Sequence, residues 1–237
     1  MTSGLPPSDE ILDFLKGSTF LGLLSDSALA TLIRSGRAKL YAPGAVICRR
    51  GDVGDSVFVV LSGSIKIRNT TQDGREVGLN FLGVGDVAGE IAVLDGGGRT
   101  ADMIALEETE VFVIQRRDIL PMLTNHPQAM LGIVEVLCDK LRNATSIIED
   151  STHEMLGRVA RGLMRLARQH GRRRKERTRI NLKLSQAELG SYLGLSRANV
   201  SRQLSDLKAS GAIEIDGAYI VIIDEGLLTK AAGAENE

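Results

Sequence analysis

Hydrophobic positions over residues 39–115 follow the short period of β-strands. Gly-rich turns interrupt this stretch about every ten positions, and the apolar runs between them are rich in β-branched residues. The run 64–68 alternates polar and apolar residues, which is typical of a half-buried strand. The pattern predicts short strands joined by tight turns, in a sandwich, barrel or jelly roll, after a helical segment at 9–35.

A helix with a longer period is predicted at residues 127–150. Its apolar residues recur at alternating spacings of three and four, the pattern of a coiled-coil seam. The seam consists of Leu131, Val134, Cys138, Leu141, Thr145 and Ile148, and a second apolar stripe consists of Ile133, Val136, Leu137 and Ile147. We expect the second stripe to pack on the β domain and the seam to form a homodimer. The alternative is a helix fully buried within one chain.

The last segment, 156–223, has the order helix, helix, turn, helix, hairpin. Ser185 and Glu188 form a capping-box pattern, which places the start of a helix at Ser185. Ser196 can cap a second helix that runs to residue 209, and Gly211 is suited to the C-terminal cap of that helix. Asp216-Gly217 between two apolar runs indicates a hairpin. This order predicts a winged helix-turn-helix. The fold class is therefore α+β, with a β jelly roll at 1–125, a dimerisation helix at 126–152 and a winged helix-turn-helix at 153–237.

Composition indicates a cytoplasmic protein with two domains. No apolar run is long enough to span a bilayer, and Met1 to Glu10 lack the layout of a signal peptide. The two cysteines, Cys48 and Cys138, form no CxxC pair and no disulfide framework. Residues 1–120 hold 12 Lys/Arg against 16 Asp/Glu, whereas residues 156–237 hold 15 against 9. A basic rear half suits contact with a polyanion, although this excess alone is unremarkable.

Residues 85–101 can bind a cyclic nucleotide. Such a ligand has a singly charged phosphate, for which Arg99, Thr100 and Ala101 can supply a guanidinium and backbone N–H groups. Its ribose 2′-OH needs a carboxylate acceptor, which Glu90 can provide, and Gly89 lets the backbone approach the sugar. The alternative is an ordinary surface salt bridge between Glu90 and Arg99.

The wider string resembles the phosphate cassette of the cyclic nucleotide-binding domain. Gly89-Glu90-Ile91-Ala92-Val93-Leu94 and Arg99-Thr100-Ala101 match its defining positions. The resemblance implies that Glu90 binds the ribose and that Arg99 with Thr100 binds the phosphate, with Gly89, Ile91 and Ala101 in the same site. It implies an allosteric ligand rather than a cofactor. We rank cAMP first as the ligand, and Thr100 leaves cGMP as an alternative.

The base of the nucleotide is expected to meet the long helix. Thr145 is a polar residue in an apolar seam, and the family's helix reaches the base near this position; Asn143 is a second candidate. A hydroxyl there can also fix the register or bond its own backbone. The family has two adjacent hydroxyl residues on this helix. The matching positions here are Ala144 and Thr145, so one hydroxyl group is missing and the base contacts are expected to differ in detail.

The second helix of the predicted helix-turn-helix carries residues that can read DNA. Arginine can grip guanine and asparagine can read adenine, while serine suits phosphates. The expected DNA-binding residues are Ser185, Gln186, Ser196, Arg197, Ala198, Asn199, Ser201 and Arg202. For one helix alone, a solvated basic face is the alternative.

Together with the cassette, this arrangement resembles the Crp/Fnr family of regulators over nearly all of residues 10–224. Arg197 and Arg202 match the family's two arginine positions, but its usual glutamate is Ala198 here. A cytosine contact is then lost, so we expect the half-site of a palindromic operator to differ or relax at one base pair. The resemblance implies double-stranded DNA, RNA polymerase and a second copy of the chain as partners.

The stretch from Arg168 to Arg179 holds seven basic residues and one acid, Glu176. Three interpretations stay open for it: a loop that touches RNA polymerase as in the relatives, a contact with flanking DNA phosphates, or a solvated loop.

Other functions are disfavoured by what the sequence lacks. It contains no readable set of catalytic nucleophile, base and acid, no metal-ligand cluster and no P-loop, so we expect no enzyme and no metal site. A haem or redox sensor of the same fold is disfavoured by the intact cassette and the scarcity of His and Cys. A scaffold acting on a kinase or channel would not need a winged helix.

Overall fold

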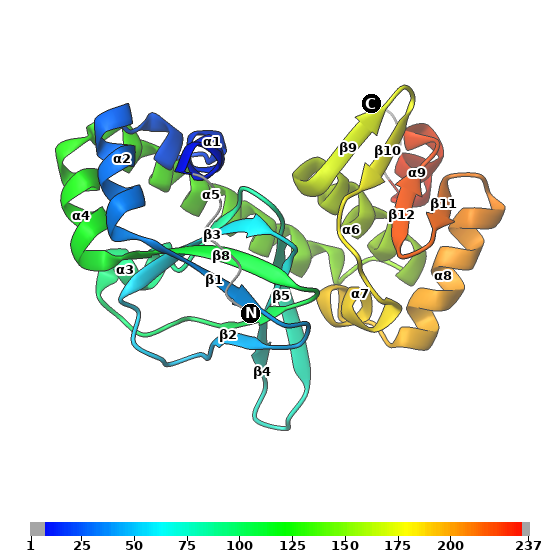
Figure 1. Cartoon of the computed structure of the whole chain (residues 1–237). Helices are drawn as coiled ribbons and strands as arrows, with labels where there is room; N and C mark the ends of the chain where they lie inside the picture. The colour runs from blue at the N-terminus through cyan, green and yellow to red at the C-terminus, as the bar shows by residue number, and fades with distance from the viewer. Residues whose placement is uncertain (1–7, 234–237) are drawn as a thin grey trace. The chain divides into compact units, whose positions relative to one another are not determined.

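The computed structural model describes residues 8–233, which divide into two compact units (Figure 1). The first unit comprises the described residues up to 69 together with 80–141, and the second comprises 70–79 and 142–233. The division falls inside the long helix, and the domain boundaries at 125/126 and 152/153 stay predictions. Residues 1–7, part of the segment considered above for a signal peptide, lie outside the described residues.

Two four-stranded sheets, most of whose residues belong to the first unit, form a β-roll, which confirms the predicted jelly roll. The sheet orders are β1-β8-β3-β6 and β2-β7-β4-β5. The strands are β1 (Arg37–Tyr41), β2 (Val46–Cys48), β3 (Ser56–Ser62), β4 (Ile65–Thr70), β5 (Glu76–Leu82), β6 (Val87–Ala88), β7 (Asp102–Ala105) and β8 (Thr109–Gln115).

Strand β3 is buried on both faces because each face meets a different core. Val57 and Val59 pack in the core that the helices cover, whereas Phe58 and Val60 pack between the sheets. A continuous apolar run is the expected sequence of such a strand.

The predicted helical segment at 9–35 is broken in the structure. It consists of α1 (Ser8–Gly17), a 3-10 turn at Leu21–Leu23 and α2 (Asp26–Ser35). A Cβ at Gly22 would lie 2.3 Å from the carbonyl oxygen of Lys16, so glycine permits the close turn. Ser25 then caps α2, because its side chain accepts a hydrogen bond from Ala28 N.

The long helix α5 (Pro127–Asp150) has the predicted bounds. Ala129 and Ile133 are buried in the core of the first unit, which also contains residues of α4 (Arg116–Asn125). Four seam residues are exposed in the single chain, namely Leu131, Val134, Leu141 and Ile148. The helix is therefore not fully buried within one chain, and a homodimer through the seam stays a proposal.

The second unit is the predicted winged helix-turn-helix. Its helices are α6 (Met155–His170), α7 (Gln186–Leu193), α8 (Arg197–Ala209) and α9 (Glu225–Ala231), and its sheet has the order β11-β12-β10-β9. The capping box of Ser185 and Glu188 is present, and Gly194 takes a φ of 64° in the turn before α8. The wing consists of β11 (Ile213–Asp216) and β12 (Tyr219–Ile222).

The basic stretch after α6 is not a loop. It forms a hairpin of β9 (Gly171–Arg174) and β10 (Arg177–Ile180), and β10 also pairs with the wing strand β12. None of the described helices is long and apolar enough to cross a membrane.

Candidate functional site

The Glu90 carboxylate is buried in the first unit and only half satisfied. Glu90 is the first residue of α3 (Glu90–Asp95), and its side chain is 2% exposed. Its Oε1 accepts a hydrogen bond from Nζ of Lys140 on α5 at 2.6 Å. Its Oε2 is buried and has no hydrogen-bond partner among the described residues. An unpaired buried carboxylate oxygen costs free energy, and this atom can accept a hydrogen bond from a donor such as a hydroxyl group.

The Arg99 guanidinium is also buried and keeps two donors free. Its Nη1 donates to the carbonyl oxygens of Ser56 (2.6 Å) and Gly89 (3.3 Å), and its Nη2 donates to Ser56 Oγ at 2.9 Å. Its Nε has no hydrogen-bond partner within residues 8–233. Because a guanidinium has five N–H groups, Nε–H and one N–H of Nη2 remain. Nε and Nη2 lie on one edge of the planar group, and such an edge can bind two phosphate oxygens.

Phe58 and Gly89 hold Arg99 in this position. The guanidinium carbon lies 4.8 Å from the centre of the Phe58 ring, so the ring shields one face of the cation. Gly89 has a φ of 87°, and a Cβ there would lie 2.4 Å from Arg99 Nη1. Glycine is therefore required both by the backbone conformation and by the approach of the arginine.

The structure contradicts the surface salt bridge considered for Glu90 and Arg99. Both residues are buried, and their polar contacts go to Lys140 and Ser56 respectively. Ala101 is buried, Ile91 is half-buried and Thr100 is exposed, all in the same unit. Contact of these three residues with a nucleotide stays a prediction.

Asn143 and Thr145 lie on the part of α5 that belongs to the second unit. The Asn143 side chain forms a hydrogen bond with Tyr192, and Thr145 is exposed. The predicted contact of these residues with a nucleotide base stays a prediction.

Helix α8 carries most of the residues expected to read DNA, and they lie at its N-terminal end. Ser196, Arg197, Ala198 and Arg202 are exposed, whereas Val200 and Leu204 are buried against the unit. Asn199 and Ser201 are half-buried. The Ser185 and Ser196 side chains cap α7 and α8, with Ser185 Oγ accepting from Glu188 N and Ser196 Oγ from Asn199 N. Gln186 begins α7 and is half-buried.

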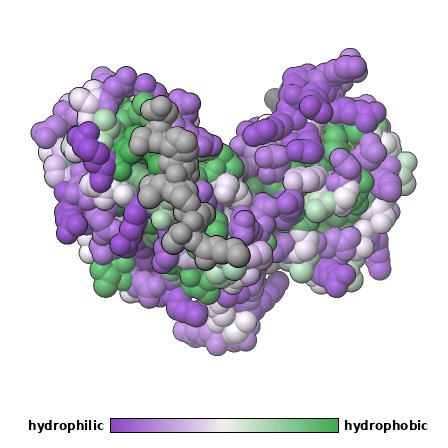
Figure 2. All heavy atoms as spheres, viewed as in Figure 1, coloured by the Kyte–Doolittle hydropathy of each residue, from purple (hydrophilic) through white to green (hydrophobic). Residues whose placement is uncertain are grey.

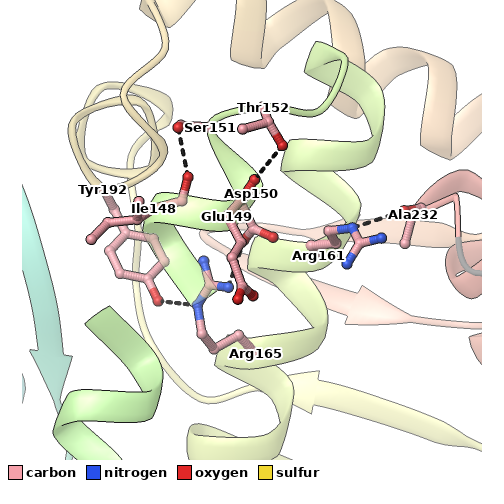
Figure 3. A network of polar contacts seen from close by, with 9 residues as sticks. All are labelled: Ile148, Glu149, Asp150, Ser151, Thr152, Arg161, Arg165, Tyr192 and Ala232. Atoms are coloured by element: carbon pink, nitrogen blue, oxygen red, sulfur yellow. Dashed lines mark hydrogen bonds and ion pairs between the residues drawn. The ribbon is translucent and has the colours of Figure 1, made fainter. Parts of the chain in front are cut away.

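A buried network joins the end of α5 to the first helix of the helix-turn-helix (Figure 3). Arg165 of α6 donates through Nη1 to Asp150 Oδ2 at 2.6 Å and through Nε to the Tyr192 hydroxyl at 2.8 Å. The Asp150 and Arg165 side chains are each 7% exposed. Burial raises the pKa of Tyr192, and Arg165 opposes that shift. Burial alone would lower the pKa of Arg165, but Tyr192 and Asp150 together raise it.

Lys140, Asp150, Arg165 and Tyr192 were not anticipated as a functional set from the sequence. A lone lysine on an amphipathic helix, such as Lys140, is ordinarily solvated. The buried Arg165 lies 15 positions from Asp150 in the sequence. Spacing carries no signal for such pairs, because the tertiary fold brings them together. No group of three or more His, Cys, Asp or Glu side chains in the described part of the chain could hold a metal ion.

Comparison with protein families gives two matches in this chain. Residues 38–126 match the cyclic nucleotide-binding domain, and residues 157–231 match the Crp-like helix-turn-helix domain. The first match includes Glu90 and Arg99, and the second includes the whole of α7 and α8.

Individual proteins resemble the chain over most of its length. A CRP-like cAMP-activated global transcriptional regulator of Mycobacterium tuberculosis is 28% identical, over 94% of this chain and 99% of that protein. The cyclic AMP receptor protein of Thermus thermophilus is 29% identical, over 92% of this chain and 98% of that protein. The structure of FixK2 from Bradyrhizobium japonicum has the same fold, with a TM-score of 0.75 and 23% identity over 85% of this chain and 99% of that one.

Proposed function

Because this chain belongs to the Crp/Fnr family of DNA-binding transcription regulators, we propose that a cyclic nucleotide switches its homodimer onto a palindromic operator. cAMP is the first candidate ligand, and it is the activator named for the relatives from M. tuberculosis and from Pseudomonas aeruginosa. The exposed Thr100 keeps cGMP as the second candidate. Contact with RNA polymerase is proposed from the family resemblance alone.

The observation that carries the proposal is the pair of unsatisfied buried atoms in the cassette. Arg99 Nε is a donor and Glu90 Oε2 is an acceptor, and neither has a partner among residues 8–233. A cyclic phosphate supplies oxygens for Arg99, and the ribose 2′-OH supplies a donor for Glu90. Lys140 donates a hydrogen bond to Oε1 of the same carboxylate and so orients the carboxylate for the sugar. A buried polar atom without a partner is costly, and this ligand would supply a partner for both.

The proposed signal passes along α5. Lys140 of this helix contacts the ribose-binding carboxylate, and Asp150 at its end is bound to Arg165, which also holds Tyr192 of α7. A ligand shifts a two-state equilibrium only by its difference in affinity for the two states. We propose that the nucleotide favours the α5 arrangement in which both recognition helices of the dimer fit adjacent major grooves.

A mobility shift tests this function directly. The full chain would be used to select duplexes from a random pool in the presence of cAMP, and the enriched palindrome would be titrated without ligand, with cAMP and with cGMP. We expect at least about tenfold tighter binding with one nucleotide, which corresponds to about 1.4 kcal/mol of coupling free energy. Equal binding in all three titrations would contradict the switch and favour a regulator with another effector. Failure to enrich any palindrome would contradict the operator proposal itself.

The homodimer can be tested through the two cysteines. Cys138 lies in the exposed seam of α5, whereas Cys48 is buried in the β-roll, where burial raises the pKa of its thiol. Symmetry of a parallel seam places Cys138 of one chain beside Cys138 of its partner. We expect mild oxidation to give a covalent dimer on a non-reducing gel, Cys138→Ser to abolish it and Cys48→Ser to leave it unchanged. A dimer lost in the Cys48 variant, or absent from the wild type, would argue against this seam.

A further inference from the structure

The β9–β10 hairpin places four arginines on one face of a sheet. Antiparallel register pairs Arg174 with Arg177 and Arg172 with Arg179, and directly opposed residues point to the same side. The opposite face of β10 carries Thr178 and Ile180, which are buried in the second unit. The arginines are therefore held on a paired, packed element, and their face is the solvent side of the sheet. Figure 2 shows hydrophilic residues over this hairpin.

The charges of this arginine face are poorly compensated within the chain. Like charges directly opposite each other destabilise a sheet, and two such pairs follow one another here. Arg172 and Arg174 have no ion-pair partner among the described residues. Arg177 lies 3.4 Å from Glu214, but both side chains are more than half exposed, so this ion pair is weak. Arg179 stacks on Tyr219, with 4.4 Å between the guanidinium carbon and the ring centre.

The turn of the hairpin adds a cation at a conformational cost. Lys175 has a φ of 54° and is the one non-glycine residue with positive φ in the described part of the chain. Glycine takes this conformation without strain. A lysine there exposes a further positive charge at the tip, and strain of this kind concentrates at functional sites.

Protection of a sheet edge does not account for the whole set. Positive side chains on an edge strand discourage pairing with other chains, which would explain Arg172 and Arg174 on β9. Arg177 and Arg179, however, lie on β10, which is an inner strand between β9 and β12. An anionic partner accounts for the arginines of both strands.

The position of the arginine face indicates which partner it fits. The sheet continues directly from the wing into the hairpin, and neighbouring strands lie about 4.8 Å apart, so β9 is about 10 Å from the wing strand β12. Arg179 contacts Tyr219, which follows the wing turn. This sheet belongs to the same unit as helix α8, and several guanidinium groups on one face suit the phosphates of a duplex.

We propose that the arginine face of β9–β10 binds the phosphate backbone of the operator duplex outside the half-site read by α8. The proposal rests on the DNA-binding function proposed above and extends its footprint. Contacts of this kind carry no sequence information, but each one releases counterions and increases the salt dependence of binding. The affinity of the protein would then depend on the length of duplex that flanks the operator.

The test compares wild type with Arg172→Gln/Arg174→Gln on two probes at a series of salt concentrations. One probe holds the selected palindrome in a 60-bp duplex and the other ends at the outer edges of the half-sites. On the long probe we expect the double variant to bind at least about tenfold more weakly at low salt. We also expect the slope of log K against log salt to fall by about 2 to 4, since each lost phosphate contact removes about 0.9. On the short probe the two proteins should bind alike.

Arg34→Gln/Arg37→Gln is the matched control, because it removes two exposed arginines from the first unit. It should behave as wild type on both probes. Equal affinity and equal slope for the hairpin variant on the long probe would overturn the proposal and leave an acidic protein surface as the partner. A loss of affinity that is as large on the short probe would also overturn it. Absence of a selectable operator for the wild type contradicts the DNA-binding function itself, which is a separate outcome.

Discussion

Replacing Arg99 with leucine is expected to lower the affinity of the protein for cAMP by at least about 100-fold. The two free donors of its guanidinium edge would form charge-assisted hydrogen bonds with the phosphate, each worth about 1.5–3 kcal/mol. The loss of both bonds corresponds to about 3 kcal/mol or more. Isothermal titration calorimetry with cAMP and with cGMP measures the effect.

Two further variants test whether the loss of affinity is specific to the guanidinium group of Arg99. Arg99→Lys keeps the positive charge but lacks the planar two-donor edge, so an intermediate affinity is expected. Arg37→Leu removes an exposed arginine of the same unit and should bind as wild type. Thermal unfolding without ligand checks that the Arg99 variants fold, since Arg99 also holds the Ser56 carbonyl. An affinity of Arg99→Leu within about threefold of wild type would contradict the proposed phosphate site.

Replacing Asp150 with alanine is expected to lower the free energy of unfolding of the second unit by about 3–5 kcal/mol. The Asp150–Arg165 ion pair is 2.6 Å long and almost fully buried, so its rupture leaves the Arg165 charge buried without its carboxylate. Urea unfolding of the full chain, followed by circular dichroism, measures the loss. The transition of the helical second unit should move to lower urea concentration.

The matched control is an exposed ion pair of the same unit. Glu214→Ala breaks the Arg177–Glu214 pair, whose side chains are 62% and 55% exposed, and should cost less than about 1 kcal/mol. The double variant Asp150→Ala/Arg165→Met removes both charges and should recover part of the stability lost by Asp150→Ala. A cost of Asp150→Ala no greater than that of Glu214→Ala would show that the buried network does not stabilise the unit.

Local patterns in the sequence were sufficient for most elements of both units. Helix α5, the capping box at Ser185 and the Asp216-Gly217 turn each depend on residues close together in the chain, and each is present where it was predicted. The helical segment at 9–35 was less well predicted, because the break near Gly22 depends on a close approach to Lys16. The basic stretch was expected as a loop, and its pairing with the wing strand is a long-range contact.

The sequence by itself determined most of the order of the elements, because periodicity, caps and turns are local properties, and its cassette motif carried the family resemblance. Only the tertiary structure decided that Glu90 pairs with Lys140, 50 positions away, and that Arg99 uses three of its N–H groups on Ser56 and Gly89. It likewise placed Arg165 between Asp150 and Tyr192 and gathered the arginines on one sheet face. Burial and partner choice depend on which segments pack together, and no single segment carries that information.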